Sequence, residues 1–203
     1  MPRFRLAFSA QAEKRAPGSI EDARGGCAPS WSSPLLATLM TLRIAAARRE
    51  DCEVVFALIR ALAEYEKLAA QVTGTAEDLR RELFHARPVI EAIIAWEGER
   101  SVGFALYFHN YSTFLARRGL YLEDLFVVPE ARGQGIGKAL IRHCARVAVE
   151  RGCGRFEWSV LDWNQPAIEF YQSIGATMMQ DWRICRLTGD TLLRFANTFP
   201  AQS

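Results

Sequence analysis

A glycine-rich turn between Arg132 and Lys138 is the part of the sequence best suited to chemistry. It reads R-G-Q-G-I-G-K and follows an apolar stretch that ends at Pro129. Proline has no N–H to give to a sheet ladder, so we expect a strand to end there and a helix to begin after the glycines. Such a turn presents several unpaired N–H groups at the positive end of a helix dipole. The segment therefore predicts a site for phosphate.

Three phosphate-binding motifs compete for this turn. A Walker A loop requires a glycine five positions before Gly137 and Ser or Thr after Lys138, but Arg132 and Ala139 occupy those positions. A dinucleotide-binding fingerprint counted from Gly133 requires a glycine where Lys138 stands. The third pattern, R-G-x-G-I-G, resembles the pyrophosphate loop of the GNAT acetyltransferases, which bind acetyl-coenzyme A (acetyl-CoA).

Three further stretches carry the same resemblance. Residues 63–68 read A-E-Y-E-K-L, residues 121–127 read Y-L-E-D-L-F-V, and residues 160–171 read V-L-D-W-N-Q-P-A-I-E-F-Y. Within the GNAT enzymes, residues 42–193 resemble the spermidine/spermine (diamine) acetyltransferase group, and its thialysine Nε-acetyltransferase branch most closely. The resemblance implies an α/β protein with the GNAT fold. In that fold helices flank a mixed, mostly antiparallel sheet, and two central parallel strands splay apart to admit the coenzyme.

Acetyl transfer from a thioester to an amine needs a neutral amine, donors for the oxyanion and a proton for the departing thiolate. Glu123 and Asp124 are adjacent, so in a strand one could serve as base while the other braces the opposite wall. We expect the N–H of Val128 to bind the oxyanion and Tyr171 to be the general acid, with Phe170 packing beside it. The alternatives are solvated edge charges for the two acids and a core ring for Tyr171.

The resemblance assigns roles to individual residues. It implies that Glu123 is the base or an amine ligand, that Asp124 helps to bind the amine and that Tyr171 is the acid. It places Glu66 and Trp182 beside the acceptor, and it implies a homodimer with the acceptor site near the interface. The implied contacts to acetyl-CoA are Phe126, Val127, Val128, Arg132, Gly133, Gln134, Gly135, Ile136, Gly137, Lys138, Asn164 and Tyr171.

Differences between this sequence and the polyamine acetyltransferases limit the range of amines that we expect as acceptors. Ala69 and Ala70 stand where those enzymes have an acidic cluster, and a long polycation needs several carboxylates to replace its hydration. The hydroxyls of Ser112 and Thr113 resemble the thialysine branch and could bind the α-carboxylate of a lysine-like amino acid. We therefore expect a small primary amine such as thialysine, a lysine-like amino acid or a short diamine. Spermidine or spermine, a protein or peptide acceptor, and a non-catalytic acetyl-CoA sensor are the alternatives.

Composition restricts the other partners. The chain has 203 residues and a formal net charge of +2, which provides no broad basic field for nucleic acid. No run approaches the roughly 18 apolar residues of a membrane helix. The five cysteines are scattered without a C-x-x-C pair, which favours free thiols in the cytoplasm over disulfides or zinc. The three histidines lack ligand spacing, so no metal is expected.

The elements that would position these residues alternate along the chain. Residues 1–39 mix Pro, Gly, Ser and Ala without periodicity, so we expect a disordered extension or a start that truly lies at Met40. Residues 40–203 form the predicted GNAT domain, with an irregular connection at 109–119. Expected strands are 42–46, 89–96, 102–108, 120–128, 156–161 and 182–187. Expected helices begin at Asp51, at Thr75, after Gly137 and at Pro166, with a short last one at 190–196.

Overall fold

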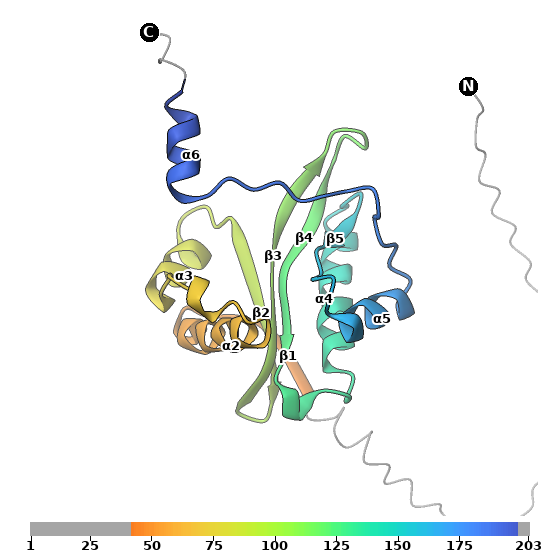
Figure 1. The fold of residues 1–203 in the computed structure, drawn as a ribbon. Helices are drawn as coiled ribbons and strands as arrows, with labels where there is room; N and C mark the ends of the chain where they lie inside the picture. Colours follow the sequence, from red (N-terminus) through yellow and green to blue (C-terminus); the bar gives the residue numbers. More distant parts are fainter. Residues whose placement is uncertain (1–41, 199–203) are drawn as a thin grey trace, which may run out of the picture.

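The computed structural model of the protein describes residues 42–198, which form a five-stranded sheet with helices on both faces (Figure 1). The predicted extension at residues 1–39 lies outside the described residues. The strands are β1 (Leu42–Ala46), β2 (Ile90–Glu97), β3 (Arg100–Ser112), β4 (Arg117–Val127) and β5 (Phe156–Trp158). The helices are α2 (Cys52–Tyr65), α3 (Ala76–Phe84), α4 (Ile136–Glu150), α5 (Gln165–Ser173) and α6 (Gly189–Ala196), with 3-10 turns η1 (Arg49–Asp51), η2 (Ala69–Gln71) and η3 (Pro129–Ala131).

The sheet is mixed and opens at one end. Its order is β1-β2-β3-β4-β5, with antiparallel pairs from β1 to β4 and a parallel pair between β4 and β5. The parallel ladder runs only from Leu120 paired with Phe156 to Leu122 paired with Trp158. Strand β4 continues to Val127, so the two strands separate beyond this point. The predicted splayed pair is thus confirmed, and we call the opening between β4 and β5 the fork.

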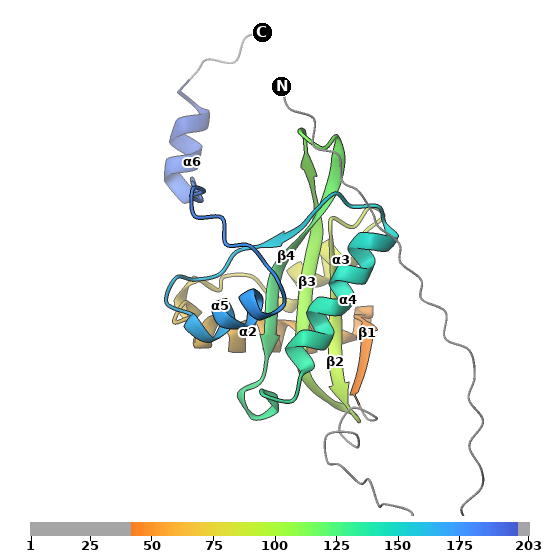
Figure 2. The same ribbon diagram turned by 90° about the vertical axis from the view of Figure 1, so that its right-hand side faces the viewer.

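Two apolar layers hold the sheet between its helices. On one face α4 buries Ile136, Leu140 and Cys144 against the strands. On the other face α2 and α3 cover a cluster that includes Val55 and Phe104. Figure 2 shows α4 in front of the sheet with α2 and α3 behind it. Complete burial of one such side chain contributes about 1.5–3 kcal/mol to stability, so the central strands form a rigid base for the fork.

Local signals placed most helix ends correctly. The predicted capping box opens α3, where the Asp78 N–H donates to Thr75 Oγ1 at 3.1 Å and the Thr75 N–H donates to Asp78 Oδ2 at 3.0 Å. Pro166 lies in the first turn of α5, where its missing N–H costs nothing. Asp51 precedes α2 as predicted, but its carboxylate accepts the N–H of Arg48 instead of capping the helix.

The predicted irregular connection at 109–119 is wrong. The ladder continues from His109 paired with Leu120 to Ser112 paired with Arg117, so β3 and β4 form one long hairpin. Its tip projects beyond α2, α3, α4 and α5 in Figure 1. Phe114 at the tip is 96% exposed, and a hairpin end without a covering helix needs no apolar alternation. The pattern that identifies half-buried strands was therefore missing here.

The predicted last strand at 182–187 is also wrong. Within residues 42–198 this segment pairs with no strand, and it runs as an extended connection to α6. Strand β5 ends at Trp158 instead of residue 161 and forms the edge of the sheet, not its centre. The expected short helix at 190–196 is confirmed as α6. No helix among the described residues is long and apolar enough to cross a membrane.

Candidate active site

The backbone of β4 turns unpaired N–H groups toward the fork. The N–H of Val128 donates to the Val102 carbonyl at 3.0 Å, so the prediction that Val128 binds the oxyanion is wrong. Successive residues of an antiparallel strand direct their N–H groups to opposite sides. The N–H groups of Leu125 and Val127 therefore point away from β3, into the fork. The carbonyl of Val127 lies on this side too, where it accepts Arg132 Nε at 2.9 Å.

The glycine turn has the backbone of an anion site. Gly133 and Gly135 adopt φ values of +77° and +83°, which L-residues with side chains rarely take. Gly135 is the N-cap of α4, and among the described residues no side chain caps this helix. A Cβ at Gly133 or Gly135 would meet no described atom within 4 Å. The first N–H groups of α4 are therefore available to a ligand that approaches through open space.

The two adjacent acids differ sharply in environment because of a β-bulge. Asp124 pairs with Leu106 while Leu122 pairs with Tyr107, so Glu123 is the extra residue of the bulge. Glu123 is exposed and Asp124 is half-buried. Burial, with the nearby charges of Glu123 and Glu66, raises the pKa of Asp124 to about 7. The sequence favoured Glu123 as the base, whereas the structure gives Asp124 the environment of a base.

Tyr171 lies at the closed side of the fork. It is 8% exposed, with its ring centroid 5.1 Å from that of Trp158 and 5.3 Å from that of Phe170. Burial and then the charge of Glu66 raise the pKa of its phenol to about 12. The expectation that Phe170 would fill the core and leave Tyr171 free is wrong, because Tyr171 is the more buried ring. Its hydroxyl is nevertheless close enough to Glu66 for the carboxylate charge to act on it.

Glu66 connects these groups. It follows the last residue of α2 and is half-buried, and burial raises the pKa of its carboxyl. Its charge raises the pKa of both Asp124 on β4 and Tyr171 on α5. The structure thus brings three of the predicted site residues together at the fork, beside the glycine turn.

Other predicted residues lie elsewhere. Ser112 is buried at the end of β3, and its Oγ accepts the N–H of Leu115 at 3.3 Å. Thr113 is exposed in the hairpin turn. The strand from Arg117, the partner of Ser112, to Asp124 spans seven residues, roughly 23 Å at about 3.3 Å per residue. Within one chain, the prediction that Ser112 and Thr113 hold the acceptor is therefore wrong. Trp182 is 73% exposed on the connection to α6, and it lines neither of the two hollows described below.

One residue at the fork was not assigned a role from the sequence. The hydroxyl of Tyr65 donates to Asn164 Oδ1 at 3.1 Å, and the guanidinium of Arg132 lies 4.4 Å from the centre of the Tyr65 ring. Arg132 also lies 5.6 Å from the buried ring of Phe126. The signals in the sequence were the position of Tyr65 directly before Glu66 and its place in the stretch A-E-Y-E-K-L at residues 63–68.

Comparisons with known proteins agree with this geometry. The acetyltransferase (GNAT) family pattern matches residues 60–176. The chain belongs to this family. It is 38% identical over 169 residues to a thialysine N-epsilon-acetyltransferase of Sus scrofa, which covers 78% of this chain and 99% of that protein. It is 45% identical over 116 residues to an L-ornithine N5-acetyltransferase of Arabidopsis thaliana, covering 57% of this chain and 48% of that protein.

Solved structures support the same fold. An integron cassette protein from the mobile metagenome of V. cholerae has a TM-score of 0.67 and 28% identity, over 78% of this chain and 99% of its own. The protein is therefore a GNAT acetyltransferase, and its family uses acetyl-CoA as co-substrate. The open glycine turn and the uncapped start of α4 fit the pyrophosphate of that molecule.

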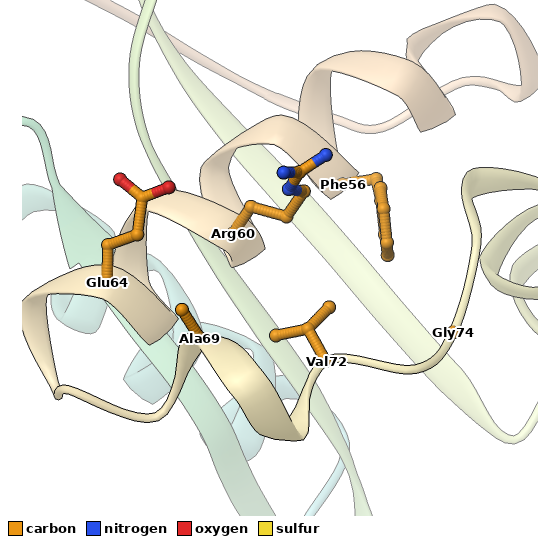
Figure 3. Close-up of a pocket in the computed structure, with 6 residues that line it drawn as sticks. All are labelled: Phe56, Arg60, Glu64, Ala69, Val72 and Gly74. Atoms are coloured by element: carbon orange, nitrogen blue, oxygen red, sulfur yellow. The ribbon is translucent and has the colours of Figure 1, made fainter.

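Two hollows accompany this acetyltransferase site. A groove of about 560 Å³ lies between α4, β5 and the end of α5, and Lys138, Arg142, Phe156 and Trp158 are among the residues that line it. A smaller hollow of about 250 Å³ lies on the outer side of α2 (Figure 3). Its residues are Phe56, Arg60, Glu64, Ala69, Val72 and Gly74, none of which was predicted as a site residue. Among residues 42–198 no group of His, Cys, Asp and Glu could hold a metal ion.

Proposed function

We propose that this acetyltransferase transfers the acetyl group of acetyl-CoA to a primary amine of a small molecule, by direct attack in a ternary complex. The observation that carries the proposal is the convergence of Glu66, Asp124 and Tyr171 on the fork beside the glycine turn. The similarity to thialysine and ornithine acetyltransferases supports an amine of the lysine or ornithine type as acceptor.

Carboxylates would bind the amine and remove its proton. Glu66, Glu123 and Asp124 together give the fork a negative charge that attracts an ammonium ion. An ammonium has no lone pair, so one proton must leave before attack. A base works best with a pKa near the operating pH, and Asp124 has a pKa of about 7. Asp124 is therefore the proposed base, with Glu123 as an exposed amine ligand.

Acetyl-CoA would supply the activated acetyl group as a thioester. The N–H groups of Gly133 to Lys138 would hold its pyrophosphate, while Lys138 and Arg142 line a groove suited to the remaining phosphate. Phe126, Val127 and Val128 form the wall of the fork along which its arm would lie. The N–H groups of Leu125 and Val127 would donate to the carbonyl oxygen as negative charge develops on it.

Tyr171 would donate the proton that the departing sulfur needs. With a pKa of about 12 its phenol is fully protonated at neutral pH. The charge of Glu66 is one cause of that high pKa, and a bound ammonium beside Glu66 would offset it. Binding of the acceptor would thus make Tyr171 a stronger acid when the proton is required.

The acceptor class is tested by thiol release from acetyl-CoA with a panel of thialysine, lysine, ornithine, putrescine, spermidine, spermine and a lysine-bearing peptide. We expect the highest kcat/KM with an amino acid or a short diamine, because the exposed Ala69 and Ala70 offer no further carboxylates for a long polycation. A preference for spermidine or for the peptide would overturn the acceptor assignment. No turnover with any amine, while CoA still binds, would favour the sensor.

A homodimer in the cytoplasm completes the proposal. Large apolar side chains of the C-terminal connection and α6 are exposed, and a second copy of the chain would cover them. They include Trp182, Ile184, Leu193 and Phe195. The cysteines among the described residues are free thiols, which supports a reducing compartment.

A further inference from the structure

Three segments far apart in the sequence meet around Tyr65, the last residue of α2. Its hydroxyl donates to Asn164 Oδ1 at 3.1 Å, 99 residues further along the chain. Its ring lies 4.4 Å from the Arg132 guanidinium and 5.9 Å from the ring of Trp163. Arg132 belongs to the glycine turn, whereas Trp163 and Asn164 belong to the β5–α5 loop. We call Tyr65, Arg132, Trp163 and Asn164 the Tyr65 bridge.

Asn164 makes this contact in place of a local one. It is the N-cap residue of α5, a position where the side-chain oxygen of asparagine usually accepts an N–H of the first helical turn. Among the described residues it makes no such capping bond. Its side-chain oxygen accepts a hydrogen bond from the Tyr65 hydroxyl instead of from an N–H of the first turn of α5. The amide is therefore placed to connect the β5–α5 loop to α2.

The turn after Tyr65 is held in an unfavourable backbone conformation. Lys67 has a φ of +61°, at a position where glycine is the usual residue of a helix end. The N–H of Leu68 donates to the Ala63 carbonyl at 2.8 Å and the N–H of Lys67 to that of Glu64 at 3.1 Å, which closes this turn. The Lys67 ammonium lies 5.9 Å from the ring of Trp163. Glycine at position 67 would remove the backbone strain of the turn, but it would lose the contact between the Lys67 ammonium and the β5–α5 loop.

Glu66 lies between these two contacts. Its carboxylate acts on Asp124 and Tyr171, while its neighbours Tyr65 and Lys67 both touch the β5–α5 loop. Any ligand that fixes Arg132 and Asn164 also fixes Tyr65, and through the backbone it fixes the position of Glu66. The rotational freedom that Glu66 must lose to bind an amine is then lost before the amine arrives.

We propose that Tyr65 is a positioning residue that couples coenzyme binding to amine binding through Glu66. The inference rests on the proposed function, which assigns Arg132 and Asn164 to the coenzyme and Glu66 to the amine. Coenzyme bound to Arg132 and Asn164 holds the Tyr65 bridge together and sets Glu66 for the acceptor. The amine consequently binds more tightly to the coenzyme complex than to the free enzyme, and by linkage the coenzyme binds more tightly when the amine is present.

The test measures the dissociation constant of the most active amine by calorimetry, with and without saturating CoA, which lacks the acetyl group and prevents turnover. For the unaltered enzyme we expect CoA to tighten amine binding about 10-fold, within the usual range of about 5- to 150-fold. Tyr65→Phe keeps the ring over Arg132 but removes the bond to Asn164. We expect it to reduce the effect of CoA to less than about 2-fold. Tyr111→Phe, on the exposed hairpin, is the matched control and keeps the full effect.

Two results would overturn the inference. One is an unchanged effect of CoA in Tyr65→Phe. The other is a loss in which amine binding weakens equally with and without CoA, as a merely structural role predicts. The proposed function is judged separately, by turnover of the unaltered enzyme on the amine panel, so that either idea can fail alone.

Discussion

Asp124 and Glu123 show how one extra residue in a strand can separate two neighbouring side chains. The bulge at Glu123 leaves it exposed and turns Asp124 toward Glu66 and the apolar layer. Loss of hydration then favours the neutral carboxylic acid, which raises the pKa of Asp124. A carboxylate that titrates near neutrality is suited to remove a proton and imposes a pH dependence on the enzyme.

The pH profile of kcat/KM for the amine distinguishes the two acids. Asp124 must be ionised to act, so activity of the unaltered enzyme should rise with pH through an apparent pKa near 7. Asp124→Asn should remove that rise and lower kcat/KM by about 10²- to 10⁴-fold. Glu123→Gln should keep the rise and mainly increase KM. If Glu123→Gln abolishes the rise while Asp124→Asn retains it, the base is Glu123.

The same group should make stability depend on pH. The pKa of Asp124 is about 7 in the folded protein and about 3.9 in an unfolded chain, so the folded state binds the proton more tightly. Stability is therefore expected to fall as pH rises from about 4 to 7. Asp124→Asn should therefore raise the free energy of unfolding at pH 8 by about 2 kcal/mol. A shift of three pKa units represents about twice that value, which we halve because water partly reaches the site.

Urea unfolding of both forms at pH 4 and pH 8 measures this effect. The advantage of Asp124→Asn should be much smaller at pH 4, where the carboxyl is protonated in the folded state and about half protonated in the unfolded chain. An equal difference at the two pH values would show that Asp124 titrates normally.

Tyr171 should contribute to kcat more than to binding. Tyr171→Phe removes the phenol proton but keeps a ring against Trp158, so folding should be preserved. We expect kcat to fall by about 10²- to 10⁴-fold with the dissociation constant of CoA unchanged. Phe170→Leu, a change in the neighbouring half-buried ring, is the control and should lower stability more than kcat. Unchanged kcat in Tyr171→Phe would remove it as the proton donor.

Among the elements, the start of α4 and the end of β4 together form the coenzyme end of the site. Strand β4 leaves its parallel partner after Leu122, which exposes its N–H groups, and α4 begins without a side-chain cap among the described residues. In an ordinary sheet or helix, these donors would be paired with carbonyls or capped. Here both sets of donors remain open, one for a carbonyl oxygen and one for phosphate.

Two glycines of the turn provide a matched test of this arrangement. Gly135→Ala forces a Cβ on a residue with φ +83°, so we expect it to lose about 1–2 kcal/mol of stability and to weaken CoA binding. In Gly137→Ala the new Cβ would meet Val127 Cγ2 at an ordinary 3.8 Å, within a helix. That variant should be as stable as the unaltered protein or slightly more stable. Thermal unfolding and CoA calorimetry report both effects, and equal losses would show that φ is not the cause.

In the whole molecule, the C-terminal region is the part least integrated with the sheet. Helix α6 stands apart from the sheet in both views (Figures 1 and 2), and the connection that leads to it crosses the strands in Figure 1. Ile184 is 70% and Phe195 60% exposed, and α6 buries none of its described residues. Such a long apolar surface is unfavourable in water for an isolated chain. A dimer offers a cover for it and for the exposed ring of Trp182.

The proposed dimer is tested by light scattering during size-exclusion chromatography. We expect twice the mass of the chain at micromolar concentrations. Ile184→Asp combined with Phe195→Asp should shift the protein toward monomer, because each charge would be buried at the interface. Val149→Asp changes an equally exposed apolar residue on α4 and should leave the mass unchanged. A monomeric unaltered protein would contradict the proposal.

Local patterns in the sequence were sufficient to predict the family, most helix ends and the location of the coenzyme turn. These follow from local rules. Gly133 and Gly135 permit the positive φ values of the turn, Thr75 and Asp78 form hydrogen bonds with each other within one turn, and Pro166 is suited to the first turn of a helix. Each rule involves residues a few positions apart. Such local signals can be recognised without knowing how the rest of the chain folds.

The environment of each group in the site depends on contacts between segments that are distant in the sequence. The bulge that separates Glu123 from Asp124 depends on the register between β4 and β3. The N–H of Val128 is hydrogen-bonded to the carbonyl of Val102, and Tyr65 contacts Asn164, 99 positions further along the chain. Ser112 was misplaced for the same reason, because the length of the hairpin decides how far it lies from Asp124. Burial, ladder pairing and charge proximity are properties of segments distant in sequence, so no local pattern could specify them.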